Sequence, residues 1–153
     1  ELDALKQRAT VLYEAGKLGD FLKSQGEESS LGGWFALMMP YRGAKVVGDH
    51  NMWPYFARRF GIQVIGHMEP LPGVPPTTKH LGELVERMRA QNVPLVLTSV
   101  FYDPRHARFV SERTGAKMVN MAHQVGAREG TDDYLQMFDY NVRQLVAALG
   151  GGG

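Results

Sequence analysis

The pattern of apolar and polar positions divides the chain into a helical start and a longer region of alternating short and long segments. From residue 44 onward, four short apolar runs alternate with four runs whose apolar residues recur at helical spacing. Gly61, Gly115 and the Asn92–Pro94 segment fall where helices should end. The pattern predicts strands at 44–48, 62–67, 95–100 and 117–121, and helices at 51–60, 78–90, 104–114 and 132–149.

This alternation is typical of βαβ units, which form a parallel sheet. The predicted strands are continuous apolar runs, as expected when helices cover both faces of the sheet. Right-handed crossovers must reverse direction once along the chain to place helices on both faces. We therefore predict an α/β fold with three layers, in which a four-stranded parallel sheet of order 2-1-3-4 has helices on both faces.

An N-terminal helical segment precedes this region. Apolar residues recur at helical spacing over Leu2–Lys23, although Gly16 and Gly19 weaken the second half of the pattern. A polar, glycine- and serine-rich stretch follows. We expect a helical lead-in at 1–33, an α/β lobe at 34–149 and a glycine tail at 150–153.

Composition narrows the functional classes. A chain of 153 residues with 44% hydrophobic residues is expected to form one domain with a real core. Its net charge of +1 gives no electrostatic reason to expect nucleic acid as a partner. The absence of cysteine excludes thiolate zinc sites, disulfides and cysteine nucleophiles. No signal peptide is recognisable, and we interpret the start at Glu1 as a processed or artificial boundary.

Three of the five histidines follow predicted strands. These are His50, His67 and His123. Parallel strands end at the same edge of a sheet, and open α/β folds bind their ligands at that edge. Because imidazole is the commonest metal-ligating side chain, this placement indicates a metal site.

Four segments of the chain resemble one family of proteins. The first is Tyr41–Val47, followed by Asp49, His50 and the 53–61 segment. In the same order come 69–77, 109–117, and 131–134 with 139–142. Together they are similar to the metal-binding solute receptors of zinc and manganese ABC transporters, and the similarity covers about 34–149.

The resemblance is to the second lobe of such a receptor alone. The resemblance implies a whole receptor of two α/β lobes that are joined by a long helix. The metal would bind in the cleft between the lobes, and the first lobe would supply two histidine ligands. The resemblance also implies a non-enzymatic metal receptor in the cell envelope, periplasmic or extracytoplasmic, that works with a membrane permease. Residues 1–23 would be a remnant of the long helix. The face left exposed would pair with the missing N-terminal lobe or with a second copy in a homodimer.

The resemblance also suggests ligands. His50 matches the histidine that follows the first strand of the second lobe; the alternative is a role in capping the next helix. His123 stands where metal-binding members have an aspartate, three residues before Gly126, and the alternative is a surface histidine in a loop. An imidazole at that place would favour Zn²⁺ over Mn²⁺, which prefers oxygen ligands.

Two further candidates are less specific. Glu69 matches the glutamate of the family's loop, and it could instead orient an imidazole by accepting a hydrogen bond. His67 has no counterpart in the family and is either an extra ligand or a solvent-facing residue. We expect Asp49 to be structural and Asp103 to cap a helix. His80 and His106, near predicted helix starts, are expected to face solvent.

Other functions remain open. A metal-assisted hydrolase would use an open coordination position to activate water. A flavodoxin-like scaffold that has lost its ligand is a third reading. Ser99, His123 and Asp103 could be assembled into a catalytic triad, although the sequence does not fix their geometry. Glycine-rich phosphate loops of the Rossmann or Walker type do not occur.

Overall fold

The computed structural model describes residues 2–24, 33–71 and 73–150 and confirms the predicted fold. Four parallel strands form one sheet in the order β2-β1-β3-β4. The strands are β1 (Lys45–Gly48), β2 (Gln63–His67), β3 (Leu95–Thr98) and β4 (Lys117–Asn120). Most of the predicted polar break at 25–33 and of the glycine tail lies outside the described residues, as does Glu1.

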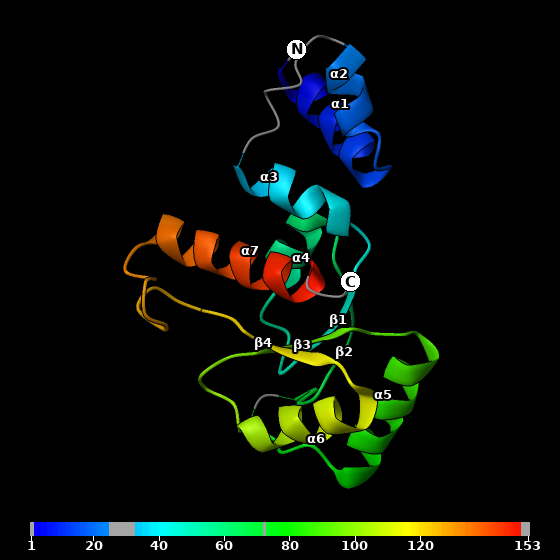
Figure 1. Cartoon of the computed structure of the whole chain (residues 1–153), viewed down its shortest axis with the longest axis vertical. Helices are drawn as coiled ribbons and strands as arrows, with labels where there is room; N and C mark the ends of the chain where they lie inside the picture. The colour runs from blue at the N-terminus through cyan, green and yellow to red at the C-terminus, as the bar shows by residue number, and fades with distance from the viewer. Residues whose placement is uncertain (1, 25–32, 72, 151–153) are drawn as a thin grey trace.

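Helices cover both faces of this sheet (Figure 1). On one face lie α5 (Thr78–Ala90) and α6 (Pro104–Thr114), and on the other lie α3 (Gly33–Met38), α4 (Pro54–Phe60) and α7 (Tyr134–Gly150). Each face has its own apolar core. The first core includes Leu84, Met88, Val96 and Val110, and the second includes Met38, Phe60, Leu97, Val142 and Leu145.

Local sequence signals explain most helix boundaries. The side chain of Thr77 caps α5, and that of Asp103 caps α6 by accepting from the backbone N–H of Arg105. Gly61 ends α4 in the left-handed conformation, with φ of 67°. Helix α4 begins at Pro54, three residues later than predicted, because proline is suited to the first turn and residues 51–53 are not helical.

The N-terminal segment forms two helices, α1 (Leu2–Glu14) and α2 (Leu18–Ser24), rather than one continuous helix. Gly16 lies between them with φ of 70°, a conformation that favours glycine. Tyr13 joins this pair of helices to the lobe through an edge-on ring contact with Phe35 in α3. A short 3-10 helix, η2 (Met39–Tyr41), then leads into β1. The origin of α1 and α2 as a remnant of a longer helix stays a prediction.

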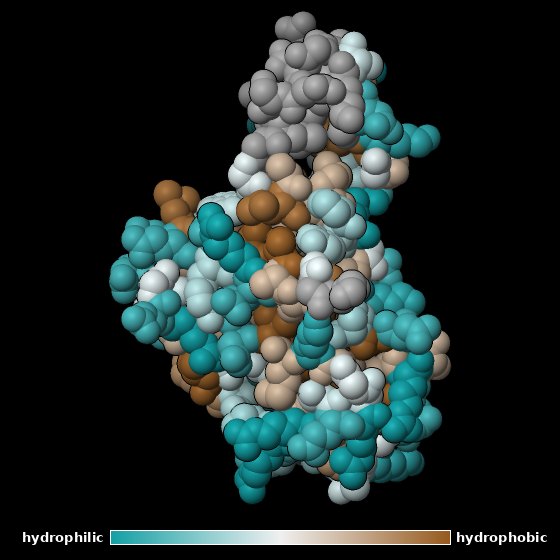
Figure 2. Space-filling view, in the orientation of Figure 1, coloured by the Kyte–Doolittle hydropathy of each residue, from teal (hydrophilic) through white to brown (hydrophobic). Residues whose placement is uncertain are grey.

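The surface differs between the two ends of the molecule (Figure 2). Apolar side chains gather over the region of α3 and α7, whereas hydrophilic side chains cover the end formed by α5 and α6. Among the described residues, no helix has both the length and the apolar character that crossing a membrane requires.

Candidate metal site

The four predicted ligands all lie at the carboxyl edge of the sheet. His50 follows β1, His67 ends β2, Glu69 follows β2, and His123 follows β4. The chain reverses direction across the sheet between β1 and β3, so the topological switch point is at the ends of these two strands. Open α/β sheets bind ligands in the crevice at this point.

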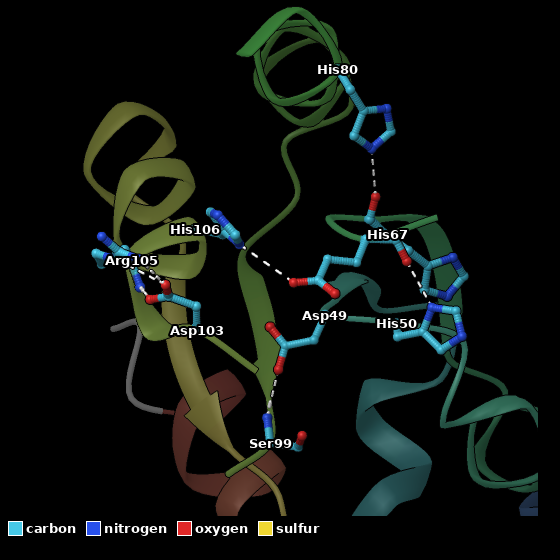
Figure 3. Close-up of polar contacts among 9 residues, drawn as sticks. Asp49, His50, His67, His80, Ser99, Asp103, Arg105 and His106 are labelled. Atoms are coloured by element: carbon cyan, nitrogen blue, oxygen red, sulfur yellow. Dashed lines mark hydrogen bonds and ion pairs between the residues drawn. The ribbon is translucent and has the colours of Figure 1, made fainter. Parts of the chain in front are cut away.

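His50 is held in a defined orientation. Its Nδ1 atom lies 2.7 Å from the backbone carbonyl oxygen of Glu69. A carbonyl oxygen can only accept, so Nδ1 carries a proton, and in the neutral imidazole Nε2 is then the nitrogen that keeps its lone pair. Metal-ligating histidines are typically oriented in this way by a hydrogen bond from the other ring nitrogen. Figure 3 shows the contact that orients the ring, and this contact selects the neutral tautomer that a metal ligand needs.

His67 lies next to His50, with their ring centroids 6.4 Å apart. Its backbone oxygen accepts a hydrogen bond from Nε2 of His80 at 2.9 Å, which ties the end of β2 to α5. Burial lowers the pKa of His67, and the neighbouring His50 lowers it further. The neutral imidazole, which is the form that binds metal, is therefore favoured.

Glu69 makes two different contacts. Its carbonyl group orients His50, so the predicted orienting contact exists but involves the main chain rather than the carboxylate. Its carboxylate Oε1 lies 3.5 Å from Nδ1 of His106. Only 9% of Glu69 is exposed, and this histidine lies at the start of α6.

His106 was expected to face solvent, and the structure places it differently. The cap at Asp103 starts α6 at the carboxyl edge, and the first turn then carries His106 toward the end of β2. Its side chain is 25% exposed. The sequence contained a usable signal, because a histidine three residues after a helix cap at the ligand edge is positioned near that edge.

Asp49 has the structural role expected for it. It is 3% exposed, and its Oδ2 atom accepts a hydrogen bond of 2.7 Å from the backbone N–H of Ser99. This contact joins the ends of β1 and β3. Burial raises the pKa of Asp49 to about 6; the Ser99 hydrogen bond opposes the shift, and the charge of Glu69 adds to it.

His123 lies at the same edge but apart from the other candidates. Strand β3 separates β4 from β1, so the ends of β1 and β4 are two strand spacings apart, about 9–10 Å. The His123 ring packs against Phe101, with centroids 4.1 Å apart. Both ring nitrogens are shielded from solvent. Burial lowers the pKa of His123, a side-chain hydrogen bond with Gln124 opposes this shift, and the positive charge of Arg128 lowers the pKa further.

The structure thus brings the His50 and His67 side chains together, places the main chain of Glu69 against His50, and leaves His123 on the far side of β3. No group of three or more histidine or acidic side chains among residues 2–24, 33–71 and 73–150 has the geometry to hold a metal ion. Whether His50 and His123 share one ion stays a prediction.

The alternative triad is not formed. Within the described residues, the Ser99 hydroxyl has no hydrogen-bond partner, and the Asp103 carboxylate binds Arg105. A triad needs the hydroxyl bonded to an imidazole that is itself bonded to the carboxylate.

Solved structures with a similar fold come from several bacteria. The chain is similar to the laminin-binding adhesin Lmb of Streptococcus agalactiae, with TM-score 0.66 and 22% identity over 87% of this chain and 50% of that one. It is also similar to the protein FpvC of Pseudomonas aeruginosa in complex with Mn²⁺, with TM-score 0.63 and 18% identity over 94% and 58%. A Mn-bound periplasmic metal binding protein from Candidatus Liberibacter asiaticus gives TM-score 0.63 and 12% identity over 96% and 58%.

The chain spans between half and three fifths of the length of these structures. No curated protein sequence matches it. A sequence model of one family, described as "Zinc-uptake complex component A periplasmic", matches residues 35–148, which is nearly the whole α/β lobe. The chain belongs to this family of metal-binding receptor proteins.

Proposed function

We propose that this chain is the divalent-metal-binding lobe of the solute receptor of a metal-uptake ABC transporter, and that zinc is its metal. The observation that supports the proposal most strongly is the geometry of His50. The carbonyl group of Glu69 fixes its protonated nitrogen, so the unprotonated Nε2 is available at the carboxyl edge.

The metal is bound first by His50 with His67. Their rings are neighbours, and burial keeps the second imidazole neutral. The Glu69 carboxylate and His123 are further ligands of the same edge in this proposal. Imidazole donors favour zinc over manganese. Structures of FpvC contain Mn²⁺ or Ni²⁺, so the scaffold itself is compatible with several divalent ions.

The remaining ligands come from outside this half. A zinc site usually has four ligands, and the described residues do not bring three together. This chain matches only 50% and 58% of two related structures, so a second lobe supplies the other side of the cleft in the proposal. The receptor acts in the periplasm, without catalysing a reaction, and delivers its ion to a membrane permease. Neither the family nor the neighbouring structures support a metal-assisted hydrolase.

Calorimetric titration of the metal-free chain with Zn²⁺, Mn²⁺ and Ni²⁺ tests the proposal. We expect Zn²⁺ to bind more tightly than Mn²⁺ and the variant His50→Ala to lose binding. The matched control is His80→Gln, since His80 lies on α5 and its amide replacement still offers a donor to the His67 carbonyl. Equal zinc affinity in wild type and His50→Ala would contradict the proposal.

Sedimentation with and without zinc tests the assembly. If a second copy supplies the missing ligands, zinc should promote a dimer. A strict monomer that binds one zinc ion tightly would show that this half already holds a complete site, and the proposal of ligands from elsewhere would then be wrong.

A further inference from the structure

A cavity opens at the switch point of the sheet, beside the candidate metal site. Its volume is about 240 Å³. This is smaller than the roughly 300–1,000 Å³ of pockets for drug-sized ligands, so its occupant must be small. The cavity lies over the ends of β1, β3 and β4, and its polar lining consists of Asp49, Thr98, Ser99, Tyr102, Asn120 and Arg128.

This cavity has an acidic side and a basic side that do not neutralise each other. Asp49 lines it from the end of β1, and Arg128 lines it from the loop after β4. Among the described contacts, the Asp49 carboxylate binds only the Ser99 N–H, through Oδ2. No described ion pair joins Asp49 to Arg128. Two opposite charges therefore face one small space without pairing.

Two buried polar atoms around this cavity lack hydrogen-bond partners in the described part of the chain. They are the Oγ atom of Ser99, a residue only 6% exposed, and the Nε atom of Arg128. A buried donor without a partner costs about 1–3 kcal/mol, so such atoms normally have one. Both are donors that suit a carboxylate.

The loop that carries Arg128 is held in place by Thr131, which is fully buried. The Thr131 hydroxyl accepts from the backbone N–H of Arg128 at 3.1 Å and donates to its carbonyl at 2.6 Å. The carbonyl of Thr131 also accepts from the N–H of Gly126 at 2.6 Å. The backbone that positions the arginine is therefore fixed before any ligand arrives, which reduces the entropy cost of binding.

We propose that this cavity binds a small α-amino acid as a zwitterion. The ligand carboxylate lies on the Arg128 guanidinium and accepts from the Ser99 hydroxyl, and the ammonium group lies on the Asp49 carboxylate. The side-chain amide of Asn120, whose oxygen already accepts from Thr98, offers its NH₂ group to the same ligand. A ligand with only a negative charge would be repelled by the carboxylate of Asp49. A ligand with only a positive charge would leave Arg128 without a partner.

This inference goes beyond the proposed function and does not depend on a metal ion. The test is a titration of the metal-free, isotope-labelled full chain, followed by amide NMR shifts. The probes are glycine and L-alanine, with acetate and methylammonium as the single-charge counterparts. We expect the amino acids to shift the amides of Ser99, Asn120 and Arg128, and each single-charge probe to bind at least about tenfold more weakly.

Two variants and one control assign the charges. Arg128→Gln should weaken amino-acid binding at least about tenfold, because a charge-assisted hydrogen bond is lost. Asp49→Asn keeps an oxygen for the Ser99 N–H, and it should weaken glycine binding while it improves acetate binding. Arg143→Gln, an exposed arginine on α7 that pairs with Asp139, should leave both unchanged.

The outcomes separate this inference from the metal proposal. His50→Ala should keep amino-acid binding even though it loses zinc. Equal binding of acetate and glycine by the wild type would show a simple anion site and overturn the inference. The amino acids are added up to about 50 mM, which is well above a millimolar dissociation constant. If no amide shifts appear at that concentration, ordered water alone satisfies Ser99 and Arg128, and the inference is wrong.

Discussion

The two halves of the carboxyl edge are built in different ways. In the β1–β2 corner, formed by His50, His67 and Glu69, the main-chain carbonyl of Glu69 orients the His50 imidazole, and the His67 ring lies beside it. In the β3–β4 corner, formed by Ser99, Asn120, His123 and Arg128, the Ser99 hydroxyl and the Arg128 Nε atom are buried without hydrogen-bond partners among the described residues. Oriented groups with a free lone pair suit a metal ion, whereas unsatisfied donors suit a polar molecule that brings its own acceptors.

The difference follows from how each strand end is connected. A short loop after β2 brings the Glu69 carbonyl back over the end of β1, and the two strands pair directly. After β4, the chain runs through residues 121–133 before α7 begins, so its side chains are positioned by turns within the loop. The β3–β4 corner is therefore a cavity, while the β1–β2 corner is a packed edge that carries two half-buried imidazoles.

The largest expected effect is on zinc affinity. Loss of groups that merely orient a ligand costs about 10–100-fold in metal affinity, so loss of a ligand should cost more. We expect His67→Ala to weaken zinc binding by more than about 100-fold, because His67 is adjacent to His50. His123→Ala should have a much smaller effect in the isolated chain, since β3 separates it from that corner.

Competition titrations with a zinc indicator measure both variants. Equal losses in His67→Ala and His123→Ala would show that one ion spans the ends of three strands. The two corners would then form a single metal site, and the distinction between a metal-binding corner and a polar cavity would be wrong.

The next effect concerns the anchor of the β3–β4 corner. Asn141 in α7 is buried, and its side chain accepts from the N–H of Ala122 at 2.7 Å and donates to its carbonyl at 2.8 Å. Asn141→Ala leaves both main-chain groups without partners, so we expect a loss of about 2–4 kcal/mol of unfolding free energy. Urea denaturation measures it.

The control for this stability measurement is Asn51→Ala. Asn51 is exposed in the bend after β1, and a surface change of this kind is usually within about 0.5 kcal/mol. Zinc affinity should be retained by the folded Asn141→Ala protein, because the β1–β2 corner does not depend on α7. A loss of zinc binding in the folded variant would link the two corners.

The next prediction concerns how stability depends on pH through Asp49, which joins the ends of β1 and β3 by its contact with Ser99. The pKa of Asp49 is about 6 in the folded protein and near 3.8 in the unfolded chain. Between these values the folded state binds more protons, so the unfolding free energy falls as pH rises from about 4 to 6. The contribution is at most about 3 kcal/mol, from roughly two pH units at about 1.4 kcal/mol each. It is fully present below the unfolded pKa and is lost above the folded one.

Asp49→Asn should remove this dependence while retaining the contact with the Ser99 N–H. The measurement is the unfolding free energy of metal-free wild type and variant between pH 4 and 7. Parallel pH profiles would mean that Asp49 is ionised throughout and that burial does not control its charge.

The sequence predicted the fold well because the fold depends on signals that are local. Apolar runs, helix spacing and the glycines at 61 and 115 together specify the sheet and its order. The edge of the sheet could be predicted for the same reason. Distances between side chains at that edge could not be predicted, because they depend on the paths of the loops as well as on strand order. His106 illustrates this, because its contact with Glu69 joins α6 to the end of β2 across 37 positions of sequence.

The smallest expected effect is on the pKa values of two histidines. The pKa of His67 is lowered first by burial and then by His50, whereas that of His123 is lowered by burial and by Arg128. His50→Ala should therefore raise the pKa of His67 and leave that of His123 unchanged, because only the first depends on His50. NMR titration of the imidazole carbon-bound protons in the metal-free chain measures both. If the pKa of His123 also changed, the charge on His50 would act across β3, and the two corners would be electrostatically one site.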